Sequence, residues 1–482
     1  MPDFVTGRYG EMLTYSLDAK KGVLLYEYIY ECIKKDILSG KIKAGTKLPS
    51  KRAFAENLGV STVTVENAYG QLMAEGYIYS EAKKGYYATD VTGIEEYHSK
   101  NTTSPQMAGF ARANDTEPQK YSVDLTSNKA DSEMFPFTIW AKLLREVINE
   151  KREELMDKAP AGGIFELRRA ISEHLMQFRG IEVSPEQIII GAGTEYLYGL
   201  LIQLLGRDKI YAVENPGYRK IYNIYKSNNA ECVYIPMDEK GATVADIEHL
   251  GADVLHISPS HHFPTGTVMP VDRRYELLKW ANSAGGRYII EDDYDSEFRF
   301  SGKPVPAMFG MSANDKVIYM NTFTKSLAST VRISYMVLPF ELIERFKENL
   351  SFYSCTVSNF EQYVLADFIE KGYFEKHINR MRNYCRKQRD ALIKQISESK
   401  IAGITEIKEE DAGLHFLLKT RLNISDEELI KKTADSGLRI SCLSQYYENP
   451  KDAPQHTLII NYSGISEAKI PEAVRLLCEC VG

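Results

Sequence analysis

The sequence predicts two folded parts of different class: a winged helix-turn-helix over residues 20–89, and a larger α/β part over residues 124–482 with a mostly parallel sheet. The first prediction rests on three helical patterns followed by two strand-like runs around a Lys-Lys-Gly turn. The second rests on six short apolar runs that alternate with helical patterns, most of them followed by a polar motif.

Composition limits the class of protein. The chain has 482 residues, of which 44% are hydrophobic and 26% charged, as in ordinary soluble globular proteins. No apolar run approaches the roughly 20 residues that span a bilayer, and the first residues lack the features of a secretion signal. Seven cysteines, an odd number with wide spacing, indicate free thiols in a reducing compartment. We therefore expect a cytoplasmic protein with neither a membrane partner nor a metal site.

Charge is unevenly distributed along the chain. Residues 20–89 hold 11 Lys and Arg against 7 Asp and Glu, a balance of +4, which leaves −11 for the remainder of a chain whose net charge is −7. A basic N-terminal module beside an acidic body indicates an anionic partner, such as DNA, for the first part only.

The N-terminal module has the order of elements of a winged helix. Apolar residues at helical spacing over 24–37 end at a Ser-Gly stop signal, and a second helix is expected over 51–58 before Gly59. Ser61 is expected to cap a third helix that runs to Glu75, and two short strands should follow over 77–80 and 86–89. Two short helices joined by a tight turn are typical of a helix-turn-helix.

In that arrangement, the third helix would meet the bases and basic side chains would meet phosphates. We expect Ser61, Thr62 and Thr64 to present hydroxyl groups to the major groove of double-stranded DNA. The candidate phosphate contacts are Lys51 and Arg52 on the second helix and Lys83 and Lys84 on the wing.

Residues 90–123 are poor in periodic apolar residues and rich in polar residues and proline, so a flexible linker is expected there. A chain of this length would have an end-to-end distance of roughly 30 Å. The DNA-binding module could therefore pack against a partner subunit.

In the larger part, strand-like runs are expected near residues 187–190, 210–213, 254–257, 288–291, 317–320 and 334–338. Polar motifs follow five of them, at 191–195, 215–218, 258–266, 292–294 and 321–326. Open α/β sheets bind ligands at the carboxyl ends of their strands. We therefore expect one ligand site where these motifs converge.

The motifs fit one planar, phosphorylated aldehyde, pyridoxal 5′-phosphate (PLP). Lys325 at a strand end could be desolvated and form a Schiff base, and Tyr218 could stack on the ring. Asp292 and Tyr294 lie two apart, so the carboxylate could hold the pyridine nitrogen protonated while the phenol binds the ring oxygen. The expected phosphate ligands are Gly193, Thr194, Thr322 and Arg332.

The N-terminal module resembles the GntR family of DNA-binding domains, through strings such as Leu48-Pro49-Ser50-Lys51-Arg52 and Leu58-Gly59-Val60-Ser61. The body resembles a fold-type-I aminotransferase, through Asn215-Pro216-Gly217-Tyr218-Arg219, through 290–298 and through Thr324-Lys325-Ser326-Leu327. Together they resemble the MocR subfamily of GntR regulators, whose best-known branch is GabR-like. The resemblance implies a large part at about 165–340, a smaller α+β part at about 341–482 with the N-terminal segment, and head-to-tail, domain-swapped homodimers. It also implies that Lys325 forms the internal aldimine.

Four departures from the family pattern matter. Thr62 stands where the family usually has an arginine, so a bidentate contact to guanine is lost. Phe263 replaces an asparagine that would bind the ring oxygen, and Gly464 replaces the arginine that clamps a substrate carboxylate. Lys220 could pair with a substrate carboxylate in place of that arginine, but only as a point charge without the bidentate geometry of a guanidinium group. Glu195 would suit a phosphate poorly, so we expect it to point away.

The leading hypothesis is a PLP-dependent transcriptional regulator that senses PLP or a small amine through the aldimine at Lys325, with no catalytic residues. The alternative is an active PLP aminotransferase with an accessory DNA-binding module, which Phe263 and Gly464 disfavour. A third hypothesis is a DNA-binding protein whose body is a scaffold without cofactor. His261 and His262 could take part in chemistry, although most loop histidines do not.

Overall fold

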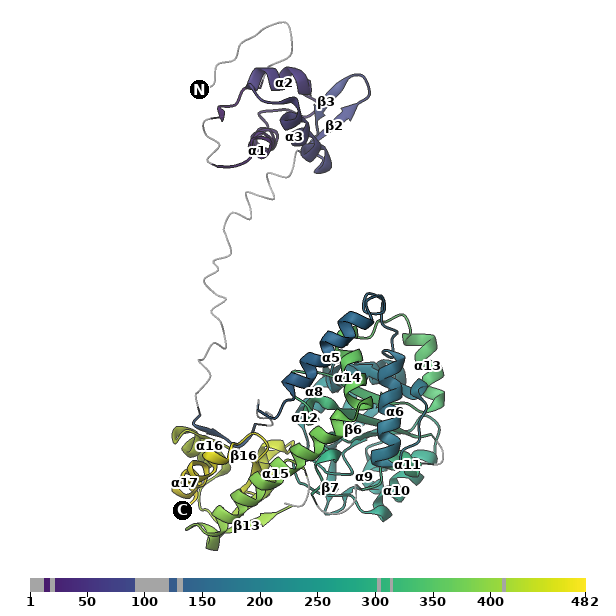
Figure 1. The fold of residues 1–482 in the computed structure, drawn as a ribbon, viewed down its shortest axis with the longest axis vertical. Helices are drawn as coiled ribbons and strands as arrows, with labels where there is room; N and C mark the ends of the chain where they lie inside the picture. Colours follow the sequence, from purple (N-terminus) through teal and green to yellow (C-terminus); the bar gives the residue numbers. More distant parts are fainter. Residues whose placement is uncertain are drawn as a thin grey trace. The chain divides into compact units, whose positions relative to one another are not determined.

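The computed structural model describes residues 13–17, 22–91, 121–127, 133–300, 305–312, 315–409 and 413–482. The chain divides into two compact units, residues 1–118 and 119–482 (Figure 1). Most of the expected linker, residues 92–120, lies outside the described residues.

The N-terminal unit is a winged helix, which confirms its expected class. Its helices are α1 (Leu25–Leu38), α2 (Lys51–Leu58) and α3 (Thr62–Ala74), and its strands are β1 (Lys47–Leu48), β2 (Ile78–Glu81) and β3 (Gly85–Ala88). The strands form an antiparallel sheet in the order β1-β3-β2. The β2–β3 hairpin is the wing.

The helix boundaries of this unit follow from local chemistry. The hydroxyl of Ser50 accepts a hydrogen bond from Ala53 N–H, and that of Ser61 accepts one from Thr64 N–H, so each serine caps its helix. Gly59 ends α2 with φ +66°, a left-handed conformation that glycine adopts without strain. The helices then bury one apolar core, which includes Ile33 of α1.

The larger unit is built on an eight-stranded sheet with the order β5-β12-β11-β10-β9-β6-β7-β8. Its strands are β5 (Ile188–Gly191), β6 (Ile210–Asn215), β7 (Glu231–Asp238), β8 (Gly241–Ala242), β9 (Val254–Ile257), β10 (Tyr288–Asp292), β11 (Val317–Thr322) and β12 (Ser334–Val337). Strands β11, β10, β9, β6 and β7 pair in parallel, whereas β12 and β8 run antiparallel to their neighbours. The mostly parallel sheet is therefore confirmed.

Helices cover both faces of this sheet. On one face lie α7 (Thr194–Leu205), α8 (Arg219–Ser227) and α13 (Phe340–Leu350), and on the other lie α5 (Phe137–Glu150), α6 (Phe165–Arg179), α14 (Asn359–Glu370), α9 (Val244–His249) and α10 (Val271–Asn282). Alternate residues of one strand serve the two faces: Ile188 and Ile190 join the core with α5 and α6, while Ile189 joins the core with α7. Burial on both faces explains the nearly continuous apolar strands.

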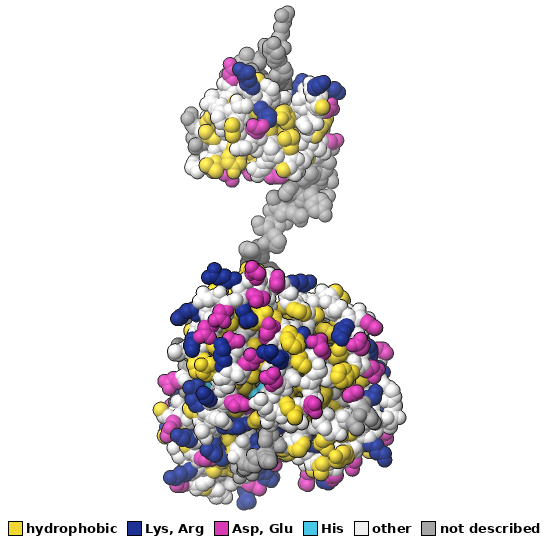
Figure 2. Space-filling model, turned by 45° about the vertical axis from the view of Figure 1, so that its right-hand side comes forward, with side chains coloured by type: hydrophobic (Ala, Val, Ile, Leu, Met, Phe, Trp, Pro, Cys, Tyr) yellow, Lys and Arg dark blue, Asp and Glu magenta, His cyan; other side chains and the backbone are white. Residues whose placement is uncertain are grey.

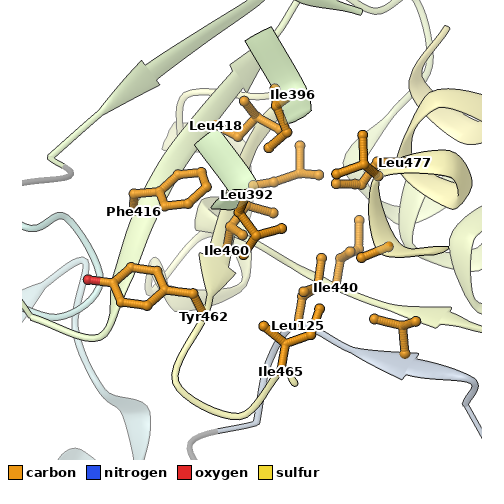
Figure 3. Close-up of a cluster of buried hydrophobic side chains, with 14 of the residues drawn as sticks. Leu125, Leu392, Ile396, Phe416, Leu418, Ile440, Ile460, Tyr462, Ile465 and Leu477 are labelled. Carbon is orange, nitrogen blue, oxygen red and sulfur yellow. The ribbon is translucent and has the colours of Figure 1, made fainter. Parts of the chain in front are cut away.

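The smaller α+β part follows the long helix α15 (Tyr373–Ser397), which runs along the unit toward it (Figure 1). Its antiparallel sheet has the order β13-β14-β17-β16, with β13 (Thr405–Lys408), β14 (His415–Thr420), β16 (Ser441–Cys442) and β17 (Thr457–Asn461). Helices α16 (Asp426–Asp435) and α17 (Ile470–Val481) pack on it. Figure 3 shows the shared core, in which Leu392 and Ile396 of α15 meet Leu418, Ile460 and Leu477.

Two local features differ from expectation. Strand β7 was not expected, because it carries no continuous apolar run and contains Pro236. The proline is tolerated there because β7 lies next to the short edge strand β8. Val123, at the end of the expected linker, is instead buried in β4 (Val123–Asp124), which pairs with β15 (Leu438–Arg439). The short helices α11 (Met308–Met311) and α12 (Phe323–Ser326) complete the unit.

Among the described residues, no helix combines the length and the apolar character that a membrane span requires. On the face of the larger unit drawn in Figure 2, basic and acidic side chains are interspersed. Among the described residues on that face, charges of the two signs are therefore mixed.

Ile33 tests the core of the N-terminal unit. Ile33→Ala removes a side chain with 0% exposure and should destabilise the unit by about 2–5 kcal/mol. Leu24→Ala, at a residue that is 61% exposed, is the matched control and should change stability by less than about 0.5 kcal/mol. Hydrogen exchange of α3 amides in the full chain measures both. Equal protection of α3 in the two variants would contradict the assigned core.

Candidate functional site

A pocket of about 290 Å³ lies where the carboxyl ends of β5, β6, β9, β10 and β11 converge. It collects side chains from segments that are far apart in the sequence. The expected residues that line it are Thr194, Tyr218, Asp292, Tyr294, Thr322, Lys325 and Arg332, and Gly193 lies against Arg332.

Lys325 lies in α12, immediately after β11. The hydroxyl of Thr322 caps this short helix by accepting a hydrogen bond from Thr324 N–H at 3.1 Å. Burial lowers the pKa of the Lys325 amine, and the nearby Asp295 carboxylate opposes this effect without cancelling it. The site thus favours the neutral, nucleophilic form of the amine more than water does.

Asp292 ends β10 and is 6% exposed. Its Oδ2 accepts a hydrogen bond from the Tyr198 hydroxyl at 2.5 Å and lies 3.5 Å from Nε2 of His256. Its other carboxylate oxygen, Oδ1, is buried without a hydrogen-bond partner among the described residues. A buried, unpaired carboxylate oxygen in a pocket requires a donor, and a protonated ring nitrogen is one.

Tyr294 also reaches the pocket. Burial raises the pKa of its phenol far above the usual value, with Asp295 and Asp292 adding to the shift, so the group stays a hydrogen-bond donor. Its hydroxyl lies 3.4 Å from Nδ1 of His261, which in turn lies 2.8 Å from Asp295. His261 therefore contacts Tyr294 but does not itself line the pocket.

The anion-binding side of the pocket lies at the N-terminus of α7. Gly193 has φ +95°, and a Cβ there would collide with the guanidinium group of Arg332. Only glycine allows the arginine to lie this close to the free amides of the helix end. The Ser334 hydroxyl donates to Thr322 Oγ1 at 2.7 Å, which fixes the threonine at the same place.

The expectation that Glu195 points away from this side is wrong. Glu195 lines the pocket, pairs with Lys220, and lies 3.5 Å from the guanidinium group of Arg332. The two cations attract the carboxylate inward. Its pKa is lowered, by Lys220 first and Arg332 second, so the carboxylate is charged at neutral pH.

Tyr218 is 51% exposed, and its ring meets that of Phe263 edge to face, with ring centroids 6.2 Å apart. Phe263 also packs edge-on against His415 and Tyr446. It fills its position with apolar surface, so that position offers no hydrogen-bond donor to a ring oxygen.

Several residues that line the pocket were not expected from the sequence. Tyr198 lies in α7, and His256 lies in the run 254–257 that was expected only to form a strand, although a polar residue in a buried run is itself a signal. Glu214 was not expected either, and it lies 3.5 Å from His262, which the sequence had already singled out; both are buried. Burial raises the pKa of Glu214 to about 8 and lowers that of His262 to about 3, so both are neutral at pH 7.

The donor set fits PLP. It provides an aldehyde-reactive amine at Lys325, an unpaired buried carboxylate oxygen at Asp292, a phenol at Tyr294 and a cationic cradle at Arg332. Among the described residues, no group of His, Cys, Asp and Glu could hold a metal ion.

A second candidate site lies on the N-terminal unit. Arg52, Thr62, Lys83 and Lys84 are exposed, and Lys84 pairs with Glu81 at 2.9 Å. The hydroxyls of Ser61 and Thr64 lie 2.8 Å from each other. Each of these two hydroxyls can therefore offer DNA only the donor or acceptor that this contact leaves unused.

Other residues of this surface were not foreseen. Glu66 of α3 pairs with Lys51 at 2.5 Å, so Lys51 has an internal carboxylate partner. Val63 is 62% exposed in the first turn of α3, and Asn67, one helical turn later, is exposed too. The apolar side chain of Val63 can contact a thymine methyl group, and the amide of Asn67 can form hydrogen bonds with adenine.

The fold and the two sites define a helix-turn-helix protein with an aminotransferase-like body. A family model described as "Bacterial regulatory proteins, gntR family" matches residues 25–87, and one described as "Aminotransferase class I and II" matches residues 121–477. The chain belongs to the MocR-type HTH transcriptional regulators, in which these two domains are joined.

Three relatives span most of the chain. The uncharacterized HTH-type transcriptional regulator YdeL of Bacillus subtilis is 37% identical, covering 96% of this chain and 98% of the relative. The probable rhizopine catabolism regulatory protein MocR of Rhizobium meliloti is 33% identical, covering 96% and 94%. The HTH-type pyridoxine biosynthesis transcriptional regulator PdxR of Corynebacterium glutamicum is 28% identical, covering 86% and 87%.

Solved structures match the body's fold. The multiple substrate aminotransferase of Thermococcus profundus has a TM-score of 0.65 at 23% identity and covers 82% of this chain and 95% of its own. The kynurenine aminotransferase of Pyrococcus horikoshii has a TM-score of 0.66 at 22% identity, covering 85% and 97%. The expected fold-type-I aminotransferase fold is therefore confirmed.

Glu214 should make stability depend on pH. Its pKa is about 8 in the folded chain against an ordinary value of 4.5, so the folded chain holds the proton more tightly and stability falls as pH rises between those values. In Glu214→Gln the amide oxygen can still accept from Ser258 N–H, but nothing ionises. Relative to wild type, the variant should gain more than about 1 kcal/mol between pH 5 and pH 8, measured by unfolding at each pH. Parallel profiles for the two proteins would refute this assignment, and Glu344→Gln, at an exposed glutamate, is the control.

The wing should contribute phosphate contacts. Lys83→Ala removes an exposed charge and should weaken binding to all DNA sequences alike, lowering the slope of log K against log salt by about 0.9. Lys347→Ala, which removes an exposed lysine of the larger unit, is the control and should leave the slope unchanged. Salt titrations of binding to a selected and a random duplex measure both. An unchanged slope in Lys83→Ala would exclude the wing contact.

Proposed function

We propose that this transcriptional regulator holds PLP covalently on Lys325 and changes its DNA binding in response to PLP itself or to a small amine. The observation that carries the proposal is the buried, unpaired Oδ1 of Asp292 in the same pocket as the Lys325 amine. A protonated pyridine nitrogen would donate the hydrogen bond that this oxygen lacks.

The bound cofactor would supply an aldehyde that exchanges between the lysine and an incoming amine. Asp292 would hold the ring nitrogen protonated, and Tyr198, which donates to Oδ2, would keep that carboxylate oriented. Tyr294 would donate to the ring oxygen and Tyr218 would cover one face of the ring. Gly193, Thr194, Thr322 and Arg332 would bind the phosphate, supported by the N-terminus of α7.

The pocket supports sensing better than turnover. Phe263 supplies no hydrogen bond to the ring oxygen, and its ring is fixed among Tyr218, His415 and Tyr446. Gly464 has no side chain to clamp a substrate carboxylate. The alternative, an active aminotransferase, is favoured by the pocket's otherwise complete donor set. Sustained formation of a keto acid from an amino donor would establish it.

Two effector classes follow from the relatives' names. One relative is called a pyridoxine biosynthesis regulator, which favours PLP as the signal, and another a rhizopine catabolism regulator, which favours a small molecule from metabolism. Any effector can shift DNA binding only by its different affinity for the two states of the regulator. The operator is double-stranded DNA, and the proposed assembly is a head-to-tail, domain-swapped homodimer.

Lys325 provides the direct test. Wild type mixed with PLP should develop a visible absorbance band, and borohydride should then fix the cofactor on the peptide that contains Lys325, as mass spectrometry would show. Lys325→Ala should lose both signals, and Lys347→Ala, at an exposed lysine, should keep them. Asp292→Asn should retain the attachment site but bind PLP at least about tenfold more weakly, because it loses a charge-assisted bond.

DNA footprints with and without PLP test the regulatory half of the proposal. A footprint that changes with PLP in wild type and not in Lys325→Ala supports PLP as the signal. An unchanged footprint in both leaves the amine class, which screening amines on the PLP-loaded protein tests. No labelled Lys325 peptide in wild type would refute the proposed covalent attachment of PLP.

A further inference from the structure

Glu195 binds two partly exposed cations, Lys220 and Arg332, on the pocket's anion-binding side. It lies in the first turn of α7, pairs with Lys220, and lies 3.5 Å from Arg332. Lys220 follows β6 and Arg332 follows β11, so the carboxylate bridges two segments that the sheet brings together. The three side chains are between 42% and 47% exposed, so they can rearrange.

A purely local explanation accounts for only part of this arrangement. An acidic residue in the first turn of a helix is favourable wherever it occurs, because the helix end carries partial positive charge. That effect does not require the carboxylate to line a pocket or to bind two cations from other segments. Both cations line the same pocket, and one of them adjoins Gly193, where the cradle is tightest.

We propose that Glu195 weakens binding of the cofactor's phosphate, so that PLP exchanges with its surroundings instead of remaining as a permanent prosthetic group. The inference rests on the proposed function and deepens it. Without Glu195, Lys220 and Arg332 would give this side of the pocket a charge of +2 beside the helix end. With Glu195 the sum is +1, and a phosphate must displace a carboxylate that already occupies the cations.

This role gives the regulator a PLP affinity low enough for the PLP concentration to control how much of the pocket is occupied. A pocket that never releases PLP has the same occupancy at every PLP concentration and cannot report it. A carboxylate that competes with the phosphate raises the dissociation constant of PLP, because it repels the phosphate dianion and stabilises the pocket without PLP. The competing charge belongs to the chain itself, so its effect is set by a single residue.

The test compares PLP with pyridoxal, which carries the same aldehyde and ring but no phosphate. Both ligands are titrated against the full chain, and binding is followed by the visible band and by equilibrium dialysis. Glu195→Gln should bind PLP about three- to tenfold more tightly than wild type, the effect expected of one partly exposed charge. Its affinity for pyridoxal should stay within about twofold of wild type.

Two further variants keep the test decisive. Glu195→Ala also removes the carboxylate and should tighten PLP binding in the same direction. Glu344→Gln removes an exposed, lysine-paired glutamate outside the pocket and controls for net charge, so neither ligand should respond. Thermal unfolding without ligand establishes that each variant is folded.

Unchanged or weaker PLP binding in both Glu195 variants would overturn the inference. Equal tightening of PLP and pyridoxal would overturn it too, because the carboxylate would then act on the ring or on Lys325. These failures differ from failure of the proposed function, in which wild type would bind neither ligand at Lys325.

Discussion

The parallel pairing of β9, β10 and β11 is the constraint on which the pocket depends. Ile289 of β10 lies opposite both Leu255 of β9 and Val317 of β11, so the three strands end at the same edge. The chain leaves each strand with a polar segment, because the apolar layers that cover the sheet stop there. One edge thus brings Asp292 and Tyr294 together with Lys325, which lies about 30 residues further along the chain. A register shift would separate the lysine from the carboxylate.

Beneath this edge, buried charges fix the segment that carries Asp292. Arg179 of α6 pairs with Asp293 at 2.8 Å, and both side chains are at most 2% exposed. The Tyr319 hydroxyl also donates to Asp293, at 2.7 Å. Removing one partner of such a pair leaves an uncompensated buried charge, so the network is costly to disturb. Consecutive residues therefore face opposite ways: Asp293 pairs with Arg179 of α6 and fixes the backbone, while Asp292 faces the pocket.

The two candidate sites share an electrostatic feature. On the winged helix, Glu66 pairs with Lys51, and in the body, Glu195 pairs with Lys220 and approaches Arg332. In each case a cation suited to a phosphate already has a carboxylate partner. An anionic ligand therefore gains less than the cation alone would offer, which favours reversible binding.

The sequence by itself determined the elements, their order and the chemistry of the chief candidate residues, because these depend on local periodicity, on caps such as Ser50 and Ser61, and on motifs at strand ends. It placed six strands of the large sheet and named part of the pocket lining: Thr194, Tyr218, Asp292, Tyr294, Thr322, Lys325 and Arg332. Tertiary structure alone decided where Glu195 points, because Lys220 and Arg332 reach it only after β6 and β11 have joined one sheet. It also made Tyr198 and His256, neither of which the sequence had indicated as a site residue, partners of Asp292. The direction of a charged side chain depends on charges that folding brings together from distant segments, and no local pattern contains them.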